Sequence, residues 1–296
     1  MPRPTSIRVG VIQPHLKRGA LDAASTMELV EPLIRQAGRA GVQLVVLPEG
    51  CPGPMRTGDD LDLEGAIAQM AREARCGVCW SRIELERPGR PVLAVHLTGA
   101  DGRPLGRYAR THPATGDVHA TLSGTGIFPG REWLRAEVAG VPVGVLVCSE
   151  LWLPEPARVL ALLGAQVLLA PAGGGFHEVR DTWRLMARAR AVENQCFVAL
   201  TQSRFGDERG SALIAGPEGI LAESETDGLI HAELDLRRME WLRRHDDSMQ
   251  VPKPFRALPG LLRARRPELY GPLTEPQPDA FDYEHPVEAS DWEAAR

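Results

Sequence analysis

The chain contains no run approaching the ~20 apolar residues that a membrane-spanning helix needs. Its first residues, MPRPTSIRVGVIQ, lack the apolar stretch and cleavage site of a secretory signal. No block of like charges indicates a binding tail. A net charge of −5 gives no reason to expect nucleic acid or an anionic membrane as a partner. We therefore expect a small-molecule partner.

Cysteine is scarce. The five cysteines are dispersed at positions 51, 76, 79, 148 and 196, and their number is odd. This is a poor disulfide framework for a chain of 296 residues, so a reducing cytoplasm fits best. Cys76 and Cys79 have the spacing of a redox or half-zinc motif, but they lack a second pair, and we expect them to pack in the core. No His, Asp and Glu cluster has convincing metal spacing, and we predict neither metal nor cofactor.

Short apolar runs alternate with helical patterns along the first 240 residues. Expected strands are 7–12, 43–47, 77–84, 92–97, 105–110, 133–138, 141–147, 166–170 and 197–201, with a hairpin turning at 217–219. Expected helices are 26–40, 64–75, 156–163 and 182–195. Buried strands that alternate with helices, together with several hairpins, predict an α/β fold with a mixed sheet covered by helices.

Periodicity fades toward the C-terminus. We divide the chain into one domain of residues 1–243 and a C-terminal extension of residues 244–296, which is rich in proline and arginine. The extension is expected to be a tail, either packed on the surface or engaged with a second subunit. Its last part, residues 274–296, is expected to be loosely held.

Two reactive side chains stand at strand ends. Cys148 follows the apolar strand 141–147, and Glu49 follows the strand 43–47. Ligands of α/β proteins bind at the carboxyl ends of strands. A thiol with a pKa near about 8.5 benefits from an adjacent base, so we interpret the pair as nucleophile and base. For each residue taken alone, a buried apolar cysteine and a surface carboxylate are the alternatives.

Four segments in fixed order point to a known family. They are LPEG (47–50), RYARTH (107–112), CSELWLPE (148–155) and WRLMARARAVENQ (183–195). From about Ile7 to Leu236 the chain resembles the nitrilase superfamily of carbon–nitrogen hydrolases. The resemblance implies a four-layer α-β-β-α sandwich, commonly a homodimer, in which a Glu, Lys and Cys triad hydrolyses a nitrile or amide through a thioester. Glu49 and Cys148 match the glutamate and the cysteine of that triad.

Two departures from the family pattern concern the pocket. Arg110 stands at the lysine position, where it keeps a positive charge but cannot act as an acid near neutral pH. Counting back from Pro129 and Gly130 places Ser123 where many members carry a second glutamate. We hypothesise that these two changes compensate sterically and bias Cys148 toward the thiolate, which would lower its pKa.

Further candidates lie near these motifs. The residues expected to bind substrate are Ser123, Ser149, Glu150, Trp152 and His177. Trp152 could close an apolar side of the pocket or be a structural residue of the following turn. His177 lies on a glycine-rich loop, where a solvated residue is the alternative. His112 is expected to orient the Arg110 segment.

The sequence thus predicts cysteine-dependent hydrolysis of a small amide or nitrile, with acyl transfer as a related possibility. A second hypothesis is a catalytically altered relative that binds a small amide or a protein partner, and Arg110 and Ser123 favour it. A third, a thiol redox protein built on Cys76 and Cys79, would leave the segments of Glu49 and Cys148 idle. The substrate itself stays open.

Overall fold

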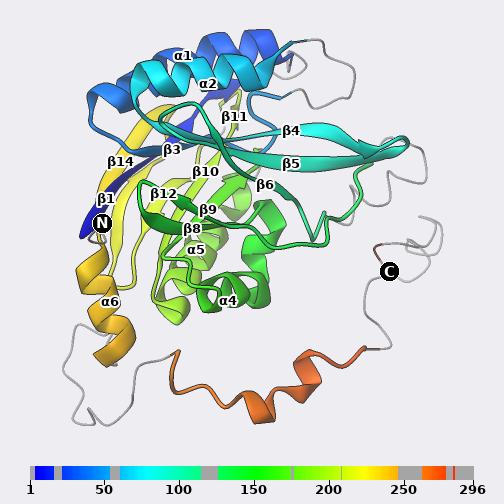
Figure 1. Cartoon of the computed structure of the whole chain (residues 1–296), viewed down its shortest axis with the longest axis vertical. Coiled ribbons are helices and arrows are strands. Elements are labelled where there is room, and N and C mark those ends of the chain that lie inside the picture. Colours follow the sequence, from blue (N-terminus) through cyan, green and yellow to red (C-terminus); the bar gives the residue numbers. More distant parts are fainter. Residues whose placement is uncertain are drawn as a thin grey trace.

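The computed structural model describes residues 4–16, 22–53, 61–114, 126–174, 177–207, 209–245, 262–277 and 283. Within these ranges two six-stranded sheets face each other, and four of the five described helices lie on their outer sides (Figure 1). The helices are α1 (Ala23–Arg39), α2 (Leu63–Ala74), α4 (Pro154–Leu162), α5 (Arg180–Asn194) and α6 (Leu236–His245). None of the described helices is long and apolar enough to cross a bilayer.

The first sheet has the strand order β14-β1-β3-β4-β5-β6. Its strands are β1 (Ser6–Gln13), β3 (Leu44–Val46), β4 (Gly77–Arg87), β5 (Arg90–Thr98), β6 (Pro104–Ala109) and β14 (Gly228–Asp235). Strands β1, β3 and β4 are parallel, and the remaining pairs are antiparallel. Because β5 reverses direction and β6 reverses it again, β6 runs in the same direction as β3.

The second sheet has the strand order β13-β12-β10-β9-β8-β7. Its strands are β7 (Arg135–Val138), β8 (Val141–Val145), β9 (Val167–Ala172), β10 (Phe197–Gln202), β12 (Ala212–Ala215) and β13 (Ile220–Ser224). The central strands β8, β9 and β10 are parallel. Two short strands, β2 (His15–Leu16) and β11 (Arg204–Phe205), form a separate parallel pair.

Side-chain alternation along the strands creates the layers. In β3 and the residue after it, Leu44 and Val46 belong to the core between the two sheets, whereas Val45 and Leu47 belong to the core beneath α1 and α2. This period of two is what a strand buried on both faces requires. Helices α4 and α5 lie on the outer side of the second sheet (Figure 1). The order of layers is the predicted α-β-β-α arrangement, and every predicted strand and helix has a counterpart within a few residues.

The two closely spaced cysteines pack in these cores, as predicted. Cys76 belongs to the core beneath α1 and α2, and Cys79 to the core between the sheets. Both are fully buried free thiols. They therefore serve as small apolar side chains in separate cores rather than as a paired dithiol.

Helix α6 is the one described helix that the sequence analysis misses. Leu236, Met239 and Leu242 are buried at a spacing of three residues, whereas Trp241 is exposed. The apolar face is narrow and four arginines interrupt it, which hides the helical period in the sequence. Helix α6 continues across the predicted boundary between the domain and the C-terminal extension at 243/244. That boundary stays a prediction.

The described part of the C-terminal extension is mostly exposed. Residues 262–277 contain two short 3-10 turns, η4 (Pro267–Leu269) and η5 (Gly271–Leu273), and this segment runs across the bottom of the view in Figure 1. Of the later residues, only Tyr283 is described. The predicted engagement of the extension with a second subunit stays a prediction.

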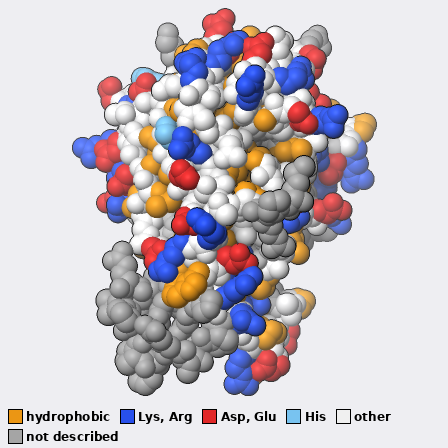
Figure 2. Space-filling model, turned by 60° about the vertical axis from the view of Figure 1, so that its left-hand side comes forward, with side chains coloured by type: hydrophobic (Ala, Val, Ile, Leu, Met, Phe, Trp, Pro, Cys, Tyr) orange, Lys and Arg blue, Asp and Glu red, His pale blue; other side chains and the backbone are white. Residues whose placement is uncertain are grey.

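Acidic and basic side chains are interspersed over the face of the molecule shown in Figure 2. Many form exposed ion pairs, such as Arg8 with Glu233 at 3.2 Å between β1 and β14, and Arg238 with Glu218 at 2.6 Å. Pairs exposed in this way contribute little to stability, typically about 0–1 kcal/mol each. The fold is therefore stabilised mainly by its two buried cores.

Candidate active site

Three segments from different strands meet at one edge of the two sheets. Glu49 follows β3, Arg110 follows β6, and Cys148 follows β8. The backbone N–H of Glu49 donates to the carbonyl of Ala172 at 3.1 Å, and this bond joins the end of β3 to the end of β9 in the other sheet. Because β3 and β6 run in the same direction, their carboxyl ends lie at the same edge. The strand ends that the sequence singled out are thus brought together.

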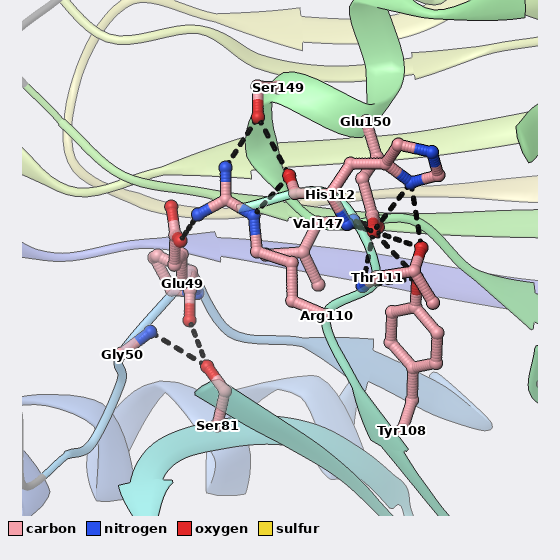
Figure 3. Close-up of polar contacts among 11 residues, drawn as sticks. Glu49, Gly50, Ser81, Tyr108, Arg110, Thr111, His112, Val147, Ser149 and Glu150 are labelled. Atoms are coloured by element: carbon pink, nitrogen blue, oxygen red, sulfur yellow. Dashed lines mark hydrogen bonds and ion pairs between the residues drawn. The ribbon is translucent and has the colours of Figure 1, made fainter. Parts of the chain in front are cut away.

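Arg110 is the centre of this meeting point (Figure 3). Its side chain is only 1% exposed, and Nη1 donates to Oε1 of Glu49 at 2.7 Å. On the other side, Nη2 donates to Oγ of Ser149 at 2.5 Å. Nε donates to the carbonyl of His112 at 3.1 Å. The planar guanidinium therefore fixes the Glu49 carboxylate, the Ser149 hydroxyl and the backbone of His112 relative to one another.

Cys148 begins a 3-10 turn, η2 (Cys148–Trp152), directly after β8 and its short continuation. Its φ is +51°, in the left-handed region that non-glycine residues seldom adopt. Backbone strain of this kind clusters at functional sites. The thiol interacts with the Glu49 side chain and with the backbone of Gly173. The residue is only 8% exposed, and its thiol lies close to the Glu49 carboxylate.

The charge state of the thiol differs from the hypothesis. Burial raises the pKa of Cys148 well above its ordinary value, and the negative charge of Glu49 raises it further. Arg110 lowers this pKa, but its effect is the smaller one. The predicted bias toward the thiolate is therefore wrong, because desolvation disfavours the charged form more than one cation favours it. Ser123, the other half of that hypothesis, lies outside the described residues.

A buried serine that the sequence analysis missed holds the loop of Glu49. Oγ of Ser81, on β4, accepts from the backbone N–H of Gly50 at 2.8 Å and donates to the carbonyl of Pro48 at 3.2 Å (Figure 3). The residues on both sides of Glu49 are thereby fixed to the neighbouring strand. A polar residue inside the apolar strand 77–84 was the available signal.

Glu150 organises the opposite side of the site and is fully buried. Its Oε1 accepts from the hydroxyl of Tyr108 at 2.7 Å, from the backbone and hydroxyl of Thr111 at 2.8 Å each, and from the backbone N–H of His112 at 2.9 Å. Its Oε2 accepts from the backbone N–H of Val147 at 2.7 Å. Figure 3 shows these contacts converging on the carboxylate.

This carboxylate is ionised and faces the protein. Burial alone would raise its pKa, but the hydrogen bonds from His112, Val147 and Tyr108 outweigh burial and hold the pKa of Glu150 below its ordinary value. The bonds join the segment after β6 to the residue before Cys148. The placement favours a positioning role for Glu150 over the predicted contact with substrate.

Of the other residues predicted to bind substrate, one lies in the site and another lies away from it. Ser149 lies in the site, where it accepts from Arg110 and donates to the carbonyl of His112 at 3.3 Å. Trp152 lies at the far end of η2, is 39% exposed and packs edge-on against Trp183 of α5 at 5.4 Å. His177 begins the short turn η3 (His177–Val179), and its side chain is outside the described part of the structure. His112 orients the Arg110 segment, as predicted.

Arg190 on α5 is a second positioning residue that the sequence analysis missed. Its Nε donates to the carbonyl of Leu151 at 2.9 Å, and its Nη2 donates to the carbonyl of Trp152 at 3.0 Å. Both carbonyls belong to η2, the turn that begins with Cys148. Arg190 lies on the buried face of α5 beside Ala187 and Ala191, and an arginine on an otherwise apolar helix face was the available signal.

The arrangement can perform covalent chemistry. A thiol lies against a carboxylate that could take its proton, and a permanent cation lies next to both. These are the parts that nucleophilic acyl transfer needs, namely a nucleophile, a base and a group that stabilises negative charge. Among the described residues, no group of three or more His, Cys, Asp or Glu side chains is placed to hold a metal ion.

Comparison with known proteins identifies the class. The family model for carbon-nitrogen hydrolase matches residues 8–244, so the chain belongs to the carbon–nitrogen hydrolase family and is an enzyme of the amidase and nitrilase type. This confirms the resemblance noted in the sequence. The family match ends at the start of the C-terminal extension.

Individual relatives cover most of the chain. The protein named "Hydrolase in pqqF 5'region" of Pseudomonas protegens is 31% identical over an alignment of 273 residues, and the match covers 86% of this chain and 88% of that protein. Deaminated glutathione amidase of Homo sapiens is 29% identical over an alignment of 287 residues, and the match covers 86% of this chain and 82% of that protein. The carbon-nitrogen hydrolase of Helicobacter pylori G27 superposes with a TM-score of 0.76 at 23% identity, covering 92% of this chain and 99% of that chain.

Proposed function

We propose that this enzyme hydrolyses a small amide through a thioester on Cys148, with Glu49 as the proton carrier and Arg110 as the stabilising cation. The observation that carries the proposal is the position of the Glu49 carboxylate, which contacts both the Cys148 thiol and the Arg110 guanidinium. Relatives named as amidases of deaminated glutathione favour an amide over a nitrile.

In the first half-reaction Glu49 takes the thiol proton while the sulfur attacks the amide carbon. The raised pKa of Cys148 fits this order, because the thiol enters uncharged and loses its proton only as it attacks. The carbonyl oxygen becomes negative, and the charge of Arg110 stabilises it. Glu49 then passes its proton to the leaving nitrogen, the carbon–nitrogen bond breaks, and an amine or ammonia departs.

In the second half-reaction Glu49 takes a proton from water, and the oxygen of that water attacks the thioester carbon. The carbon–sulfur bond breaks, the acid product forms, and the thiolate regains its proton from Glu49. Arg110 keeps its proton throughout, because a guanidinium does not ionise in proteins. Every proton transfer therefore falls to Glu49, and Arg110 acts by charge and position alone.

One observation favours the second candidate, a relative that binds an amide without turnover. The buried ion pair of 2.7 Å between Arg110 and Glu49 engages the carboxylate that must accept the thiol proton. The two candidates differ in the fate of a bound amide. The binding-only protein keeps it intact, and Cys148→Ala leaves its affinity unchanged.

Cellular setting and assembly belong to the same proposal. We infer a cytoplasmic enzyme, because all five cysteines are buried free thiols. We also infer a homodimer, on the resemblance to the nitrilase superfamily.

The test is ammonia release from a panel of simple amides and nitriles. We expect wild type to release ammonia from at least one amide, and Cys148→Ala to lose roughly 10³-fold or more in kcat. Arg110→Gln is expected to lose roughly 10²-fold or more in kcat, the usual effect of removing a group that stabilises the oxyanion. Cys76→Ala, which removes a buried thiol from the core beneath α1 and α2, is the matched control and keeps wild-type kcat.

Mass spectrometry of the acid-quenched enzyme adds a direct observation. It is expected to show the mass of the acyl group on the peptide that contains Cys148. Turnover that survives Cys148→Ala would refute the mechanism. Absence of turnover with intact amide binding would establish the second candidate.

A further inference from the structure

One residue of the C-terminal extension lies beside the candidate site. Tyr283 is partly buried, and its ring meets the imidazole of His112 edge-on, with centroids 5.9 Å apart and planes at 88°. His112 also stacks on Trp133, with centroids 5.9 Å apart and planes at 23°. Edge-to-face and stacked pairs at this spacing are favourable contacts that fix the relative position of the rings. Tyr283 thus has a defined place next to the Arg110 segment.

The hydroxyl of Tyr283 is within electrostatic reach of the charged groups of the site. Partial burial raises the pKa of its hydroxyl, the positive charge of Arg110 lowers it, and the negative charge of Glu150 raises it. The net direction is upward, so the hydroxyl stays protonated at neutral pH. Both charges therefore act on the phenol, whose ring stands against His112.

The support beneath Tyr283 is rigid. The backbone of His112 donates to Glu150 at 2.9 Å and accepts from Nε of Arg110 at 3.1 Å. The ring of Tyr283 therefore rests on the residue that links the active-site cation to the buried carboxylate. A side chain in that place can define the shape of the pocket.

Tyr283 also lies outside the part of the chain that matches the family model, which ends at residue 244. Glu49, Arg110 and Cys148 all fall inside that part. The aromatic residue is therefore an addition that this chain's own extension makes to a site whose chemical groups lie in the matched domain. An added wall changes which substrates fit more readily than it changes the chemistry.

We propose that Tyr283 forms the outer wall of the amide pocket and limits the length of the acyl group that the enzyme accepts. This inference rests on the proposed function, since it assigns a specificity-determining residue to that site. The ring packs against His112, whose carbonyl accepts from Arg110, so an acyl chain that extends from the cation past His112 meets it.

The test compares kcat/KM along a series of linear amides from acetamide to hexanamide. In Tyr283→Ala the ratio of hexanamide to acetamide is expected to rise about tenfold or more, the effect of opening an apolar pocket. Tyr283→Phe keeps the ring and is expected to keep the wild-type ratio within about twofold. Tyr270→Ala, which removes a tyrosine that packs on Arg265 in the same extension, is the matched control and also keeps that ratio.

An unchanged ratio in Tyr283→Ala would overturn the proposal, whatever the absolute rates. A rise of the same size in Tyr270→Ala would also overturn it, because the effect would then belong to the extension in general. A ratio, unlike a rate, is unaffected by a loss of folded enzyme. A merely structural role of Tyr283 therefore leaves it unchanged.

A second measurement serves if wild type turns over no amide, an outcome that would defeat the proposed function alone. Cys148 is alkylated with iodoacetamide or with the bulkier N-phenylmaleimide, and the modified peptide is identified by mass spectrometry. Tyr283→Ala is then expected to raise the rate with the bulky reagent about fivefold or more relative to the small one, by the same opening of the pocket. Equal reagent ratios in wild type and Tyr283→Ala would overturn the inference about Tyr283.

Discussion

Replacing Glu150 by glutamine should lower the stability of the protein, although the two side chains have nearly the same shape. The carboxylate accepts five hydrogen bonds, four on Oε1 and one on Oε2. An amide retains one acceptor oxygen and directs an NH2 group at a donor that previously had a partner. A buried donor left without an acceptor costs about 1–3 kcal/mol, and bonds to a neutral acceptor are weaker than bonds to a charged one by roughly 1 kcal/mol.

Relief from burying a charge offsets part of this loss. We therefore expect Glu150→Gln to lower the free energy of unfolding by roughly 2–4 kcal/mol, which is a large share of the about 5–15 kcal/mol that holds a typical domain. The measurement is the denaturant midpoint and slope at pH 7.5, followed by tryptophan fluorescence. Glu132→Gln, at an exposed position, is the matched control and should stay within about 0.5 kcal/mol of wild type.

The pH dependence has a definite sign. The pKa of Glu150 is lower in the folded protein than in the unfolded chain, so its stabilising contribution is present above the unfolded value of about 4.3. That contribution is lost as the pH falls through the folded value. The stability gap between wild type and Glu150→Gln should therefore narrow below about pH 4. A Glu150→Gln variant as stable as wild type at pH 7.5, or a gap that widens in acid, would refute the reasoning.

Two further predictions concern the nucleophile and its turn. The rate of alkylation of Cys148 by iodoacetamide should keep increasing above a pH of about 8.5, the pKa of a free thiol, because burial and Glu49 raise the pKa of Cys148. Glu49→Gln should move this increase in rate to lower pH. A wild-type rate that levels off below a pH of about 8 would contradict the prediction. Arg190→Met removes both donors from the carbonyls of η2 and should lower kcat about tenfold, corresponding to about 1.4 kcal/mol. The control in the ammonia assay is Arg188→Met, which removes a hydrogen bond from the same helix to the carbonyl of Gly216. Equal kcat in the two variants would contradict the role of Arg190.

Local patterns were sufficient for most of the fold. The strand at 43–47 and its neighbours could be predicted because a buried strand shows a short apolar run whatever lies around it. Helix α6 could not, since its apolar stripe of Leu236, Met239 and Leu242 becomes recognisable only when β1 lies beneath it. The exposed arginines between these residues dominate the sequence pattern.

The sequence by itself determined which groups could react. Glu49 and Cys148 stand at strand ends, and an acid and a thiol in those places were recognisable without coordinates, as was the arginine at position 110. Only the tertiary structure decided what each group faces. Glu150 follows the nucleophile by two residues, yet its carboxylate faces the chain, and Tyr283 reaches the site from a segment remote in sequence. The charge state of the thiol was likewise a tertiary property, because the balance of burial, one acid and one cation depends on distances in space that sequence spacing does not contain.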